Sequence, residues 1–405
     1  MLSEDAIDNL IQPFVDRQEA VNQYITGLIA ERIKEVGQLS KNDIAQLNRL
    51  VQMGGDVRKI NAALAQLADV QVKDVKKVIK TVAIDTYQNA KPFYDYRHKS
   101  FIPFEKNEPL QKIVSAVSKV TGDTFVNLSN SRATGFLMPA QNHKYMNVFT
   151  DIQTTYRRII DEAIQAGLSG VDYRVAIRRA LKQLADSGIR RVSWDSGYTQ
   201  RLDTVVRRNV LDGIRSVRQQ IDDEAGKQYG SDGKELSVHV NSALDHEPFQ
   251  GHQFSNEEFE NLQSDRDFED VNGKKFSAVE RAIGQYNCRH FASSIIIGQK
   301  EPKYTEQELQ KFIDNNHKGF TLKDGKHLTM YECTQYQRQL ETKIRQLKDS
   351  QIIAMKAGDR DLALQYQARV VKYTNDYNEF SKATNLGVKK DRLQVSGYRK
   401  IPVKV

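Results

Sequence analysis

The sequence predicts a mainly α protein with a small α+β module: an elongated helical N-terminal half, a compact domain around His/Cys motifs, and a C-terminal antiparallel helical hairpin. Apolar residues recur at helical spacing through most of the 405 residues. Short strand-like stretches gather in one segment, 201–300. The hydrophobic fraction, 39%, is low for one compact chain of this length, because larger cores need proportionally more apolar side chains.

The region 1–105 is predicted to hold four amphipathic helices. The first covers 3–36, with Pro13 as a candidate kink. The second ends at the sequence MGGD, and two more begin near Val57 and Val72. Their apolar stripes must face each other or a partner.

Aromatic, basic and proline residues are concentrated in the segment 91–109, "KPFYDYRHKSFIPFEKNEP". The favoured interpretation is a connector that packs on its own protein, since loop aromatics usually fill a groove. The alternative is stacking on single-stranded nucleic acid.

The middle region, 106–200, shows helical periodicity at 109–121, 147–167 and 172–188. Gly167 and Gly188 are predicted helix stops. The following sequence, "IRRVSWDSG", is typical of a short strand or extended segment.

The region 201–300 is predicted to form the α+β module. It opens with a helix whose arginines lie opposite an apolar face, and nearby aspartates favour a solvated, ion-paired surface over phosphate binding. That apolar face holds Leu202, Val205, Val206, Val210, Ile214, Val217 and Ile221. The stretches "ELSVHV" and "FASSIIIG" are predicted strands.

The region 301–405 is predicted to contain a small β-hairpin around "KDGK" and then two long helices, 329–356 and 359–384. The first would extend roughly 40 Å. Their short connection, "AGD", predicts an antiparallel pair. Cys333 on the first helix is interpreted as a packed thiol.

Two motifs, "HEPFQGHQF" at 246–254 and "YNCRHF" at 286–291, raise a chemical question. One hypothesis is a zinc site, because four donors of the right type are present, although their spacings differ from those of usual zinc ligands. The four donors are His246, His252, Cys288 and His290.

The favoured alternative is structural: Cys288 is buried, and His246 and His290 bond to backbone or carboxylate. Arg289 then pairs with an acid such as Asp245 or Glu247. A third hypothesis is catalysis, either by a Cys288–His246 nucleophilic pair or by a metal-dependent nuclease that uses Asp245. No phosphate-binding GxxxxGK[ST], dinucleotide-binding GxGxxG or HExxH motif occurs in the sequence.

The formal net charge is +8, from 60 basic and 52 acidic residues. This balance suits a protein near nucleic acid, but a densely charged helical surface explains it equally well. Two cysteines are too few for a disulfide framework and indicate a reducing compartment. The N-terminus lacks the pattern of a secretory signal, and no membrane partner is evident.

Several stretches in 201–395 resemble the phage minor capsid protein 2 family, which is related to the Mu F-like minor head proteins of tailed phages. The departures are Phe249 and Tyr286, where that family commonly has Trp, and His252, where it commonly has Lys. The matching residues include Asn209, Gly213, Val217, His239, His246, Gln250, Gly251, Phe254, Ser255, Asn287, Cys288, Arg289, His290 and Gly298.

This resemblance implies a structural virion component rather than an enzyme, placed inside the head near the portal and acting in head assembly, DNA packaging or genome ejection. The implied partners are the portal protein, the major capsid or scaffolding protein, and packaged double-stranded DNA bound without sequence preference. No cofactor is expected under this interpretation, and zinc stays a hypothesis. The rival is a metal- or Cys-dependent nuclease or hydrolase centred on Asp245, His246, Cys288 and His290.

Overall fold

The predicted fold class is confirmed: the chain is mainly helical, with a few small antiparallel sheets. The computed structural model describes residues 2–36, 44–128, 133–140, 143–168, 173–192, 199–263, 268–269, 275–276, 283, 290–299 and 301–402. Within those residues no helix combines the length and apolar character needed to cross a bilayer.

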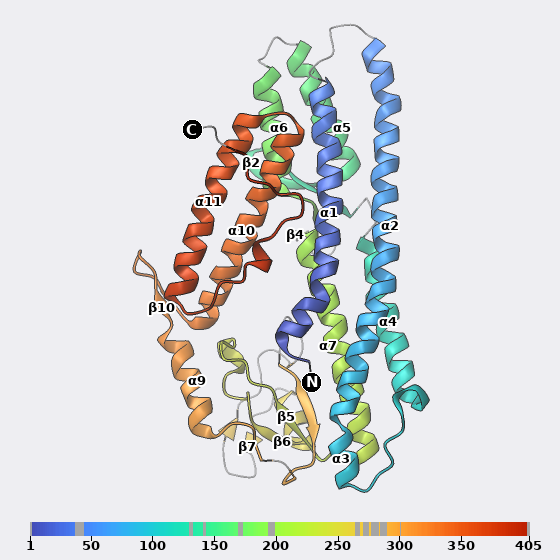
Figure 1. The fold of residues 1–405 in the computed structure, drawn as a ribbon, viewed down its shortest axis with the longest axis vertical. Helices are drawn as coiled ribbons and strands as arrows, with labels where there is room; N and C mark the ends of the chain where they lie inside the picture. Colours follow the sequence, from blue (N-terminus) through green and yellow to red (C-terminus); the bar gives the residue numbers. More distant parts are fainter. Residues whose placement is uncertain are drawn as a thin grey trace.

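Four long helices form the body of the elongated molecule and run along its long axis (Figure 1). α7 packs against the other three, so it is the central helix of the body. The four are α1 (Glu4–Val36), α2 (Ile44–Asn89), α4 (Glu108–Leu128) and α7 (Leu202–Tyr229).

The main core lies between these helices. The rings of Phe14 on α1 and Phe125 on α4 stack with centroids 5.8 Å apart. The predicted apolar face of α7 is buried along its length, apart from the half-buried Val205. Helical periodicity thus found the buried face because only one stripe of a helix can meet its neighbours.

The predicted break at MGGD is wrong, because α2 runs without interruption from Ile44 to Asn89. A Cβ atom at Gly54 or Gly55 would meet nothing within 4 Å, so these glycines relieve no crowding. The next residue, Asp56, is buried and accepts hydrogen bonds from Arg32 of α1 and from Tyr156. These contacts of Asp56 with Arg32 and Tyr156 therefore offset the low helix propensity of the two glycines.

One end of the body carries a sheet and a helix pair, visible at the top of Figure 1. The sheet has the strand order β2-β1-β3-β4, and neighbouring strands are antiparallel. These elements are β1 (Thr134–Ala140), β2 (His143–Asp151), α5 (Ile152–Leu168), α6 (Tyr173–Ser187), β3 (Arg190–Val192) and β4 (Thr199–Arg201).

The predicted helix 147–167 begins too early, since Asn147–Asp151 belong to β2 and the helix starts at Ile152. β2 pairs with β1, whose Phe136 and Met138 are fully buried. The cross-strand pairing and this burial outweigh the helical pattern, as tertiary context often does. Gly167 lies inside α5, whereas Gly188 follows α6 in the left-handed conformation, as predicted for a stop.

The aromatic connector packs on its own protein, as favoured from the sequence. It includes α3 (Lys91–Tyr96) and the short helix η1 (Phe104–Lys106). Phe93 stacks on Tyr229 of α7 at 5.2 Å, and Phe101 stacks on Tyr87 of α2 at 4.4 Å. The connector thus closes the lower end of the four-helix body.

The small module lies at that lower end (Figure 1). Its sheet has the antiparallel order β6-β5-β9, so the predicted strand near "FASSIIIG" is confirmed, while "ELSVHV" only overlaps the end of β5. The elements are β5 (Gly233–Leu236), η2 (Leu244–His246), β6 (Gln253–Ser255), α8 (Asn256–Leu262), β7 (Phe268–Glu269), β8 (Lys275–Phe276), β9 (Ala292–Ile295) and α9 (Glu306–Lys318).

The C-terminal helical hairpin is confirmed. α10 (Met330–Lys356) and α11 (Arg360–Ala383) pack on each other, after the predicted β-hairpin of β10 (Phe320–Thr321) and β11 (His327–Leu328). Cys333 is fully buried. The segment after α11, with the short helix η3 (Asp391–Leu393), folds back over the pair and buries Leu393 and Ile401.

Candidate functional site

Three of the sequence-predicted histidines form a cluster in the small module. The His239 and His290 rings meet edge to face with centroids 4.7 Å apart, and the His246 and His290 rings do so at 5.2 Å. His246 is 2% exposed and His290 8%. His246 Nε2 also lies 3.6 Å from a carboxylate oxygen of Asp245. The two motifs therefore meet in space although they are far apart in the chain.

Gln250 ties this histidine cluster together. Its buried side-chain oxygen accepts the backbone N–H of His239 at 2.9 Å and lies 3.5 Å from Nε2 of His290. Gly251 follows with φ +77°, and a Cβ there would come within 2.5 Å of Leu309 on α9. Glutamine thus supplies a hydrogen bond, and glycine permits a turn against α9 that a side chain would block.

His252 makes different contacts. Its Nε2 lies 2.9 Å from Glu306 of α9, and its Nδ1 faces the backbone oxygens of Phe249 and Gln250. Among the residues that the structure describes, no three His, Cys, Asp or Glu side chains are grouped so as to hold a metal ion. Three further motif residues, Asn287, Cys288 and Arg289, lie outside the described residues.

A second set of contacts joins the module to the C-terminal hairpin. The buried Asn316 of α9 donates to Glu247 and to the backbone oxygen of Ser242. Its side-chain oxygen accepts the backbone N–H of Tyr331 at the start of α10, at 2.7 Å. His317 also contacts Glu247, at 2.8 Å. Glu247 therefore binds α9 here, where sequence reasoning considered acids of this loop as partners of Arg289.

Two other family-matching residues set the spacing between α7 and α4. The Asn209 amide donates to the backbone oxygen of Thr121 at 3.1 Å. One turn later, a Cβ at Gly213 would lie 2.6 Å from the Thr121 hydroxyl oxygen. Glycine at this position therefore lets the two helices approach closely.

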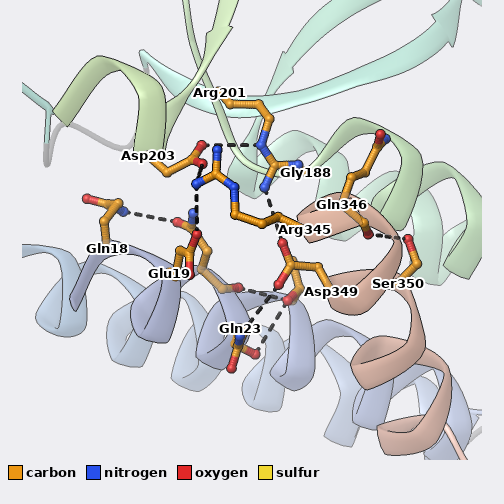
Figure 2. A network of polar contacts seen from close by, with 12 residues as sticks. Gln18, Glu19, Gln23, Gly188, Arg201, Asp203, Arg345, Gln346, Asp349 and Ser350 are labelled. Carbon is orange, nitrogen blue, oxygen red and sulfur yellow. Dashed lines mark hydrogen bonds and ion pairs between the residues drawn. The ribbon is translucent and has the colours of Figure 1, made fainter. Parts of the chain in front are cut away.

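Five charged side chains form a largely buried network where α1, β4, α7 and α10 meet (Figure 2). Arg345 Nη1 lies 3.2 Å from Glu19 and 3.2 Å from Asp203. Arg201 lies 3.2 Å from the other oxygen of Asp203 and 3.2 Å from Asp349. The result is an alternating chain of carboxylates and guanidiniums that joins the first helix to the C-terminal hairpin.

The surroundings shift the proton affinities of this network. Burial raises the pKa of Glu19 to about 8 despite the nearby positive charge of Arg345. Burial likewise raises the pKa of Asp349, against the opposing effect of Arg201. For Asp203, burial acts in the same direction, but Arg201 and Arg345 together outweigh it and lower the pKa. Asp203 is thus held ionised between the two guanidiniums.

Sequence reasoning missed this network. Arg201 and Asp203 are close in the chain, and so are Arg345 and Asp349 on α10, but Arg345 and Glu19 are 326 positions apart. Gly188 belongs to the same junction, because a Cβ there would lie 2.8 Å from the Arg201 guanidinium. Its role as a helix stop was visible in the sequence, but its second role was not.

A groove of about 580 Å³ lies between α1 and α2. Its wall is mostly apolar or small, and Tyr24 and Val70 on it are 41% and 39% exposed. The lining residues are Arg17, Ala20, Val21, Tyr24, Lys59, Ala62, Ala63, Gln66, Leu67 and Val70. Such a surface can accept an apolar side chain or helix face from a partner.

Comparisons with known proteins agree with the motif residues. Neither the curated proteins nor the solved structures contain a match to this chain. The model of the family described as phage minor capsid protein 2 matches residues 2–382, which includes the N-terminal helices, the module and the helical hairpin. This chain therefore belongs to the phage minor capsid protein 2 family, a group of structural capsid proteins, and is a virion component.

Proposed function

We propose that this protein acts inside the phage head near the portal vertex, where it binds the portal protein and supports head assembly, DNA packaging or genome ejection. In support, the chain belongs to a family of phage capsid proteins, and it exposes a mostly apolar groove between α1 and α2 that offers a binding surface. The other apolar faces of the helices are buried against each other, whereas this groove is exposed. Exposed apolar surface of this kind is typical of a binding site for a partner. The major capsid or scaffolding protein would be a further neighbour.

Site-specific cross-linking in assembled particles tests the position. A photo-reactive amino acid at Gln66, which lines the groove, is expected to form an adduct with the portal protein. Val120 of α4 serves as the control, because it is 69% exposed and does not line the groove. Adducts from Gln66 to other proteins alone, or equal portal adducts from both positions, would contradict the proposal. Imaging of the portal vertex with and without the protein gives an independent check.

We further propose that the histidine cluster is structural and that the chain is not an enzyme. In support, the polar side chains of the cluster contact each other: the Gln250 side-chain oxygen faces His290 Nε2. Glu247 accepts a hydrogen bond from Asn316. The rival nuclease or hydrolase needs an accessible centre, whereas His246 is 2% exposed. Turnover of DNA or an ester substrate that disappears in His246→Ala or Cys288→Ala, with the circular dichroism spectrum unchanged, would overturn this part.

A further inference from the structure

The buried network has an uneven charge. Three carboxylates, Glu19, Asp203 and Asp349, share two guanidiniums, Arg201 and Arg345. With every group ionised, this set would carry one uncompensated negative charge. Burying such a charge is costly, and a carboxyl in this position takes up a proton instead.

The three carboxyls differ in how well the arginines compensate their charge. Asp203 lies between both arginines, so its charge is the best compensated. Glu19 and Asp349 are the ends of the chain, and each has one arginine. The Asp349 side chain is 19% exposed and also accepts the Gln23 amide at 3.5 Å, whereas the Glu19 side chain is 3% exposed. Glu19 is therefore the group for which ionisation costs most.

One further cation faces this region. Lys348 of α10 lies close enough to Glu19 to feel its charge, but its amine is bound to the backbone oxygen of Leu393 at 2.5 Å, and burial lowers its pKa. Charged groups that act on Glu19 thus come from β4 (Arg201), α7 (Asp203) and α10 (Arg345, Lys348 and Asp349). Lys348 moderates the excess charge without forming an ion pair with Glu19 in the structure.

We propose that the Glu19 carboxyl carries a proton at neutral pH and that losing it loosens α1 from the α10–α11 hairpin, which makes this junction a pH-dependent latch. α1 contacts α10 directly, and the network begins at Glu19 and returns to α1 at Gln23, one turn away. Deprotonation places an uncompensated charge at the start of this contact. The same helix forms one wall of the groove between α1 and α2, so the latch controls the position of that wall.

The direction of the effect follows from linkage. On folding, the pKa of Glu19 rises from 4.5 to about 8. At a pH between these two values the folded protein keeps a proton on Glu19, whereas the unfolded chain has released it. The stabilising effect is therefore fully present below the unfolded pKa and is lost as the pH rises toward 8. It levels off above that point.

Hydrogen exchange of the full chain tests the latch. After correction for the intrinsic pH dependence of exchange, protection of α1 amides is expected to fall by about tenfold per pH unit between about pH 6 and about pH 8. Glu19→Gln, which stays neutral, is expected to abolish this dependence and to protect α1 more than wild type does at alkaline pH. The control is Glu31→Gln, an exposed position on the same helix, which should keep the wild-type profile.

Three results would overturn the proposal. The first is α1 protection that does not change with pH in the wild-type protein, which needs no variant and so does not depend on whether Glu19→Gln folds. The second is a folded Glu19→Gln protein with the wild-type pH dependence. A profile that flattens in Asp349→Asn and not in Glu19→Gln would also overturn it, since the proton would then belong to the other end of the chain.

Discussion

Asp8 near the N-terminus and Arg392 near the C-terminus form an ion pair at 2.5 Å across 384 positions of sequence. The same carboxylate pairs with Arg207 of α7, also at 2.5 Å. Asp8 thus holds the C-terminal segment and the central helix on α1. Arg392 lies beyond residues 2–382, the part of the chain that the family model matches.

Asp8→Asn is expected to destabilise this contact by about 1–3 kcal/mol, because two arginines lose a charged hydrogen-bond acceptor in a partly buried site. The measurement is chemical denaturation together with limited proteolysis of the C-terminal segment, which should be cleaved sooner in the variant. Asp123→Asn, an exposed change on α4, is the control. Equal stability and equal cleavage of all three proteins would show that the ion pairs contribute nothing.

Glycine substitutions should have opposite effects at two helical positions. Gly213→Ala places a methyl group 2.6 Å from the Thr121 hydroxyl oxygen and is expected to cost about 1–3 kcal/mol through overpacking between α4 and α7. Gly54→Ala meets nothing within 4 Å and is expected to gain about 0.5–1 kcal/mol from helix propensity. Urea denaturation of both variants checks the pair. A stabilising Gly213→Ala would mean that the helices separate at little cost.

Gln250→Ala is expected to destabilise the small module by about 1–3 kcal/mol, because the His239 backbone N–H loses its side-chain acceptor. The matched control is Gln66→Ala, which removes an exposed glutamine on α2. Hydrogen exchange should locate the loss of protection in β5, β6 and β9 rather than in the long helices. Loss spread evenly over the chain would contradict a local role.

Purified protein is expected to contain no stoichiometric zinc, since His252 is bound to Glu306 and the other three imidazoles contact one another or Gln250. Elemental analysis of wild type beside Cys288→Ala and His290→Ala provides the measurement. One zinc ion per wild-type chain, lost in either variant, would establish the zinc hypothesis instead.

Duplex DNA should bind weakly and without sequence preference, with affinity that falls at least about tenfold between about 50 mM and about 200 mM salt. The net charge of +8 arises from a mixture of 60 basic and 52 acidic residues, so few phosphates can be neutralised at once. Fluorescence anisotropy with two unrelated duplexes is the measurement. An affinity that does not change with salt concentration, or that differs strongly between the two duplexes, would indicate a dedicated DNA-binding site.

Patterns local in sequence determined much of the architecture. The spacing of apolar residues predicted the buried face of α7, and the connection Ala357-Gly358-Asp359 predicted the antiparallel hairpin. These predictions succeed because helical periodicity and short turns depend on residues a few positions apart. The same local signals failed at Gly54-Gly55 and at β2, where contacts from distant segments decided the structure.

The sequence by itself determined that His246 and His290 belong to one module and that the chain carries the motifs of a minor capsid family. Only the tertiary structure separated His252 from the histidine cluster and brought Glu19, Asp203 and Asp349 around two arginines. The physical reason is that a side chain's partner depends on which helix faces lie opposite each other in the folded molecule. Glu19 and Arg345 have no local sequence relationship, yet in the folded protein they are in contact, and burial raises the pKa of Glu19.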